Sequence, residues 1–96
     1  RTAEEEQEEI ALSYRILFTS KAAKEFERLS SVVRGRVSRK LEVLRETPFP
    51  AGVLKLVGGY EGHRLRVGDW RIFYTVDADV KHVTVYAIRH RSEAYR

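Results

Sequence analysis

Apolar residues in this chain follow two spacings: they alternate over short stretches near both ends and recur every three to four positions between them. Tyr14, Ile16 and Phe18 lie on one side of an alternating segment, which predicts a short N-terminal strand. Thr19 and Ser20 follow, and both are residue types that cap the start of a helix. The pattern therefore predicts a strand that leads directly into a helix.

Two amphipathic helices are expected in the next part of the chain. The first has three apolar residues at helical spacing: Ala22, Phe26 and Leu29. The second follows a serine pair at positions 30–31 and has a longer apolar stripe: Val33, Val37, Leu41 and Leu44. A run with two prolines at 47–50 ends it, because proline lacks the helical N–H and restricts the residue before it. Each stripe needs a sheet to pack against.

The second half of the chain is rich in strand patterns. Residues 63–67 and 70–76 alternate on either side of Gly68-Asp69, and residues 83–88 form a third such run. Residues 53–57 are also compatible with a short strand in an otherwise glycine-rich stretch. The outline is β-α-α-β-β-β, an α+β domain. We expect an N-terminal strand, a two-helix hairpin and an antiparallel three-strand meander, with the helices on one face.

The glycine at the start of the Gly68-Asp69 pair favours a two-residue type II′ turn. Such a turn pairs residues 67 with 70, 66 with 71, 65 with 72 and 64 with 73. Because side chains alternate across a sheet, Leu65, Val67, Trp70 and Ile72 should lie on the covered face. The opposite face would then carry four residues: Arg64, Arg66, Arg71 and Phe73.

Arginine directly opposite arginine destabilises a sheet by up to ~1 kcal/mol per pair, so this arrangement calls for a reason. A bound polyanion gives one, because guanidinium groups bind phosphate oxygens in pairs and keep their charge. The competing interpretation is that the arginines pair with carboxylates, for which Asp69 and Glu61 are the nearby candidates. We favour phosphate binding.

Charge is unevenly distributed. Residues 1–13 contain one arginine and five glutamates, a net charge of −4, while the whole chain carries +4, so residues 14–96 carry +8. A domain this basic favours a polyanionic partner, either a nucleic acid or an acidic protein. We divide the chain into residues 1–13, an acidic extension or expression remnant, and a domain over residues 14–96. The acidic segment could be solvated, or could fold back on the basic face.

Composition excludes several classes of function. There is no cysteine, so a disulfide framework or thiolate metal site cannot form. The three histidines lack metal-site spacing, and we expect neither a metal nor a cofactor. No apolar run approaches the ~18 residues of a membrane span, and no signal-peptide pattern is evident. A cytoplasmic protein without a membrane partner is expected.

Three blocks of sequence, in order, resemble the RelE family of toxins. They are Lys55-Leu56-Val57-Gly58, then residues 63–74, HRLRVGDWRIFY, then residues 88–95, IRHRSEAY. With the order of elements, the resemblance covers residues 14–96. It implies an enzyme, a ribosome-dependent endoribonuclease that cuts messenger RNA in the ribosomal A site by metal-free attack of a ribose 2′-hydroxyl, and so inhibits translation. It also implies a cognate RelB-like antitoxin in a hetero-oligomer.

The resemblance also assigns roles to residues. Arg71 and Arg89 would stabilise the phosphorane, and Tyr95 would orient or stack the target nucleotide. Phosphate and RNA contacts would come from Arg64 and Arg66, joined by Lys55 and Arg91. The well-known members have lysines at the positions of Arg64 and Arg66, and arginine cannot readily accept a proton. The general base is therefore open among His90, Tyr95, Glu93 and Lys55, of which His90 has the most suitable intrinsic pKa, or catalysis rests on positioning by the ribosome.

The face on which Arg89 lies depends on where the third strand ends. In a regular third strand it would share the buried face of Val83, Val85 and Ala87, so the strand must end or contain a bulge before it.

Two alternatives remain. The ParE branch of the same superfamily shares the fold and acts on DNA gyrase. The ParE branch does not keep one set of residues that is present together in this chain. The set is Arg64, Arg66, Arg71, Arg89 and Tyr95, and its presence favours the ribonuclease. A cleavage-deficient module that binds RNA or antitoxin is the other alternative, because of the arginine-for-lysine change.

Overall fold

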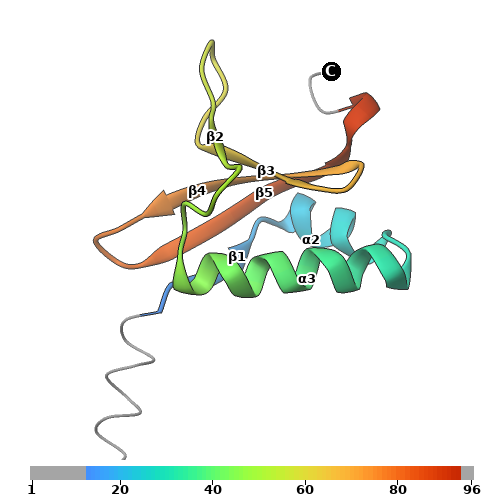
Figure 1. Ribbon diagram of the computed structural model, residues 1–96, viewed down its shortest axis with the longest axis horizontal. Coiled ribbons are helices and arrows are strands. Elements are labelled where there is room, and N and C mark those ends of the chain that lie inside the picture. The colour runs from blue at the N-terminus through green and yellow to red at the C-terminus, as the bar shows by residue number, and fades with distance from the viewer. Residues whose placement is uncertain (1–12, 94–96) are drawn as a thin grey trace, which may run out of the picture.

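The computed structural model describes residues 13–93 of the chain. Its elements, in chain order, are β1 (Arg15–Phe18), α2 (Ser20–Glu27), α3 (Ser31–Glu46), β2 (Leu54–Lys55), β3 (His63–Val67), β4 (Trp70–Asp77), β5 (His82–His90) and the 3₁₀ helix η1 (Arg91–Glu93). Both long helices lie on one side of the sheet (Figure 1). The segment that joins β2 to β3 and the 3₁₀ helix η1 rise on the other side (Figure 1). The predicted α+β class and order of elements are confirmed.

The helices begin where the sequence predicts. The Thr19 hydroxyl accepts a hydrogen bond from the Ala22 N–H at 3.1 Å, and the Ser30 hydroxyl accepts one from the Val33 N–H at 3.3 Å. These bonds satisfy N–H groups that have no partner within the first helical turn. The longer helix ends at Glu46, and its C-cap residue Thr47 directly precedes Pro48. Local sequence therefore sets both ends of the helical hairpin.

The five strands form one sheet in the order β1-β5-β4-β3-β2. Strands β2 to β5 pair antiparallel, but β1 runs parallel to β5. The sheet is therefore mixed, and the expectation of an antiparallel sheet holds only for its second half. The reason is that the helical hairpin carries the chain from β1 across the sheet before β2 begins, and the meander then returns to β1 from the far edge. The core lies between the sheet and the helices.

A β-bulge in β5 changes which side chains face the helices. Phe73 pairs with Ala87, but Tyr74 pairs with Val85, so Tyr86 is the extra residue. Before the bulge, Val83 and Val85 point into the core; after it, Ile88 does. Ala87 and Arg89 therefore lie on the opposite face, which resolves the placement of Arg89.

Candidate functional site

The hairpin between β3 and β4 has the register that its turn predicts. Val67 pairs with Trp70, and Arg66 pairs with Arg71. Gly68 has a φ of +60°, whereas Asp69 has a negative φ, as a type II′ turn requires. The predicted turn is confirmed. It fixes which residues of both strands lie away from the helices.

Three arginines lie side by side across three adjacent strands on the face away from the helices. Arg66 of β3 is opposite Arg71 of β4, which is in turn opposite Arg89 of β5. We call these three residues the arginine row. Because neighbouring strands lie ~4.8 Å apart, the row spans only about 10 Å across the sheet. Arg64 is two residues from Arg66 on the same face.

The electrostatics of the row show a real concentration of positive charge. The pKa of Arg71 is lowered, first by partial burial and then by repulsion from Arg64, Arg66 and Arg91; Asp69 opposes the shift. Arginine nevertheless stays charged at any physiological pH, because its ordinary pKa lies far above that range. Repulsion between the cations therefore costs free energy in the folded protein, and a bound anion would offset this cost.

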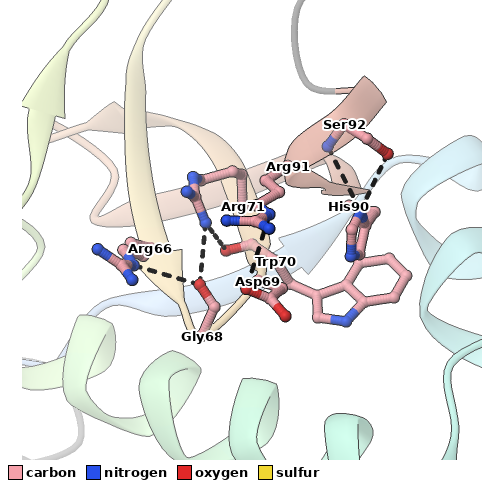
Figure 2. A network of polar contacts seen from close by, with 8 residues as sticks. All are labelled: Arg66, Gly68, Asp69, Trp70, Arg71, His90, Arg91 and Ser92. Atoms are coloured by element: carbon pink, nitrogen blue, oxygen red, sulfur yellow. Dashed lines mark hydrogen bonds and ion pairs between the residues drawn. The ribbon is translucent and has the colours of Figure 1, made fainter.

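Backbone carbonyls, rather than carboxylates, hold two members of the row. The guanidinium groups of Arg66 and Arg71 both donate to the Gly68 carbonyl, at 3.2 and 3.0 Å (Figure 2). Arg71 also donates to the Trp70 carbonyl at 3.0 Å. Within residues 13–93 neither arginine forms an ion pair. Asp69 lies 3.8 Å from Arg91 and offsets only part of the repulsion at Arg71, so net positive charge remains for a ligand.

The third member of the row is held by a residue that the sequence did not point to. Arg89 forms an ion pair with Glu25 of α2, with 3.7 Å between Nε and Oε2. The other oxygen of Glu25 accepts a hydrogen bond from the Ile88 N–H at 3.1 Å. This N–H lies beyond the last residue of β5 that β1 pairs with. Glu25 thus fastens the free edge of β5 and orients Arg89.

The 3₁₀ helix η1 is fixed to the hairpin turn. The Arg91 N–H donates to the Asp69 carbonyl at 2.7 Å, and its guanidinium lies 3.8 Å from the Asp69 carboxylate (Figure 2). Arg91 is close enough to Arg71 to lower its pKa. The structure therefore brings together five of the arginines that the sequence singled out: Arg64, Arg66, Arg71, Arg89 and Arg91.

Two other candidate residues lie on the helix side of the sheet. His90 is opposite Trp70, with its ring centroid 5.3 Å from the indole in an edge-on contact, and its Nδ1 is 3.0 Å from the Ser92 hydroxyl (Figure 2). Lys55 pairs with His63, which stacks on the buried Tyr74. In the strand register neither residue shares a face with the arginine row, although His90 and Arg89 line one hollow together with Glu25.

The remaining candidates for a proton acceptor are Glu93 and Tyr95. Glu93 lines a hollow of about 440 Å³ together with Glu25, Arg89 and His90. Tyr95 lies outside the described residues, so its assigned role stays a prediction. His63 is half-buried, and burial, followed by repulsion from Lys55, lowers its pKa. His63 therefore belongs to the packing of the sheet, between Phe49 and Tyr74.

Residues 13–93 contain no group of three or more histidine or acidic side chains placed to bind a metal ion. No helix in the same range is long and apolar enough to span a bilayer.

The chain is similar to known proteins both in sequence and in fold. The family model of the ParE toxin of type II toxin–antitoxin systems, parDE, matches residues 16–95. No match was found among curated proteins. The chain is therefore placed by a family pattern rather than by a characterised near relative.

Several solved structures share the fold. The isolated Escherichia coli RelE toxin is 29% identical, with a TM-score of 0.71 over 85% of this chain and 90% of that one. The archaeal RelE–RelB complex from Pyrococcus horikoshii OT3 gives 26% identity and a TM-score of 0.73 over 84% and 98% of the two chains. RelBE2 from Mycobacterium tuberculosis, at 22% identity and a TM-score of 0.74 over 82% and 99%, shows the fold alone. The resemblance found in the sequence is confirmed at the level of the superfamily. The chain belongs to the ParE toxin family within the RelE/ParE superfamily, and is a toxin of a type II toxin–antitoxin system.

Proposed function

We propose that this toxin is an endoribonuclease that cuts messenger RNA in the ribosomal A site and so stops translation in the cytoplasm. The observation that carries the proposal is the arginine row, in which three arginines are paired across three adjacent strands. A face with this geometry suits a phosphate that gains negative charge during a reaction. Arg64 and Arg91 flank the row and suit the neighbouring phosphates of one strand.

The proposed reaction is an internal transfer. The ribose 2′-oxygen attacks the adjacent phosphorus as its proton leaves, the bond to the next nucleotide's 5′-oxygen breaks, and that oxygen gains a proton. The products are a 2′,3′-cyclic phosphate and a 5′-hydroxyl, and no metal takes part. Arg71 and Arg89 stabilise the phosphorane, and the loss of one such donor typically costs ~2.7–4 kcal/mol.

Proton transfer is the step to which the arginines contribute least, because a guanidinium does not readily give up its proton. Of the four side chains considered as the base, Lys55 and His90 face the helix side. We therefore assign the nucleotide contact to Tyr95 and leave the proton to Glu93, Tyr95 or ribosomal groups. Catalysis then depends mainly on charge stabilisation and on positioning by the ribosome.

An antitoxin is the second partner that we propose. Related structures are complexes of RelE with RelB. Residues 14–96 here carry a net charge of +8, which favours an acidic segment that covers the arginine row. Toxin and antitoxin would form a hetero-oligomer in which the toxin is inactive.

Gyrase poisoning is the alternative function, and the match to the ParE family favours it. The two functions differ in their target and share the fold. The arginine row favours the nuclease, because concentrated cations opposite one another suit a phosphate that gains charge.

The deciding experiment adds the purified toxin to translating ribosomes and maps the 3′ ends of the message, with a gyrase supercoiling assay in parallel. We expect cuts within A-site codons and unchanged supercoiling. Arg71→Ala should slow cleavage by about 10²–10³-fold. Arg39→Ala, which removes an exposed arginine from α3, should cleave at the wild-type rate. Intact message with inhibited supercoiling would replace the nuclease by the gyrase function.

A further inference from the structure

A small hollow next to the arginine row is lined mainly by aromatic rings. It has a volume of about 190 Å³ and is bordered by Tyr60, Phe73, Tyr86, Ala87 and Arg89. Phe73 and Ala87 are almost completely buried, so its floor is rigid. The rings of Phe73 and Tyr86 have centroids 6.0 Å apart and are tilted by 45°.

The bulge and the segment before β3 create this hollow together. The bulge turns Ala87 to the face away from the helices, where its small side chain leaves room beside Phe73. The Tyr86 hydroxyl donates to the Glu61 carbonyl at 2.5 Å, and this bond holds the segment that carries Tyr60 over the sheet. The wall and the floor therefore come from parts of the chain about 25 residues apart.

The hollow and the arginine row are neighbours along the strands. Phe73 is two residues from Arg71 on β4, and Ala87 is two residues from Arg89 on β5. Two residues of a strand span about 7 Å. Arg89 borders both features. A ligand held by the row at a phosphate would place the next group of atoms over the rings.

The size and chemistry of the hollow favour one kind of occupant. Pockets that enclose a drug-sized ligand measure ~300–1,000 Å³, so this hollow suits a single flat ring system. Aromatic walls with a cation at the rim match an unpaired base whose own phosphate lies next to it. We propose that this hollow receives one unpaired base of the bound RNA, while Arg89 and Arg71 hold the adjacent phosphate.

This inference rests on the proposed function, and it adds how the substrate strand is held. Stacking tolerates any base, because every base has a π-face. The hollow should therefore fix the position of a nucleotide relative to the arginine row without selecting its identity strongly. It also requires a single strand, since a paired base could not enter.

The test compares two ligands that carry the same phosphates. One is a six-nucleotide RNA, and the other is the same backbone made wholly of abasic nucleotides; both are titrated with the free protein at low ionic strength by fluorescence anisotropy. We expect the wild-type toxin to bind the complete RNA about 5- to 150-fold more tightly, the range of one base–aromatic stack. Tyr60→Ala should lose much of this ratio and still bind the abasic chain normally.

Two variants serve as controls. The ring of Phe49 packs on His63 and is about as exposed as that of Tyr60, with exposed fractions of 52% and 47%. Phe49→Ala removes this ring and should keep the full ratio. Arg71→Ala should weaken both ligands by a similar factor. Circular dichroism of each variant confirms the fold.

Equal affinity for the two ligands, or an unchanged ratio in Tyr60→Ala, would overturn the base assignment and leave the hollow to a protein side chain. Failure to bind either chain would overturn it as well. The proposed function is judged separately by cleavage on the ribosome. A toxin that shows the binding ratio but leaves the message intact would keep the base site and lose the nuclease.

Discussion

The face of the sheet that α2 and α3 cover and the face that carries the arginine row are built from the same three strands, β3, β4 and β5. On the covered face, Leu65, Ile72 and Val85 are buried and pack with the helices. On the other face, one or two residues away, cations lie opposite cations. The first face lowers the free energy of the fold, and the second raises it. A strand that alternates between the two can carry stability on one side and ligand binding on the other.

The largest expected effect on this comparison comes from the covered face. Ile72→Ala removes a fully buried side chain and should lower the free energy of unfolding by about 2–5 kcal/mol. Urea denaturation measures the change. Its neighbour Arg71, replaced by alanine, should lose cleavage and keep nearly all of its stability. If Arg71→Ala unfolded as easily as Ile72→Ala, the two faces would not have separate roles.

A smaller effect concerns pH. Burial raises the pKa of Tyr74 to about 12, and its hydroxyl donates to the Pro48 carbonyl at 2.7 Å. The folded state then holds this proton more tightly than the unfolded state, whose pKa is near 10. Stability from this group is complete below pH 10 and is lost as the pH rises toward 12, by up to roughly 2–3 kcal/mol.

Denaturation curves between pH 8 and pH 11 test this expectation. Tyr74→Phe keeps the ring and should flatten that alkaline slope, although it loses one buried hydrogen bond. An unchanged slope in Tyr74→Phe would assign the alkaline loss to other groups.

The smallest effect has the opposite sign and belongs to the arginine row. Arg66→Gln removes one of two facing cations and should raise the free energy of unfolding by up to ~1 kcal/mol at low salt. The gain should shrink as salt screens the repulsion. Arg39→Gln changes the net charge equally on an exposed helix surface and should show no such gain. A loss of stability in Arg66→Gln at low salt would mean that its bond to the Gly68 carbonyl outweighs the repulsion.

Much of this architecture could be predicted because it depends on local pattern. Alternation about Gly68-Asp69 determined the register of Arg66 with Arg71, and capping residues determined where both helices begin. The parallel pairing of β1 with β5 could not be predicted in this way, because it depends on where the helical hairpin returns the chain.

The candidate site was predictable only in part, for a similar reason. The arginines of the hairpin follow from one turn, but the position of Arg89 depends on the bulge at Tyr86, and the run Val83–Ile88 does not distinguish a bulge from an early end of the strand. Glu25 reaches the site through its hydrogen bond with Ile88, which is 63 residues away in the chain. The segment that carries Tyr60 is held there by the bond between Glu61 and Tyr86, which are 25 residues apart. No spacing in the sequence encodes such contacts.

The bulge at Tyr86 also shifts the alternation of side chains along β5 by one residue. Residues after it have the opposite parity to those before it, so Arg89 faces outward and His90 faces the helices. A regular strand of the same sequence, with Tyr86 paired in the ladder instead of bulged, would exchange the two. The imidazole of His90 would then replace a guanidinium, a permanent cation, in the row. The extra residue at the bulge thus determines that the row contains a third permanent cation.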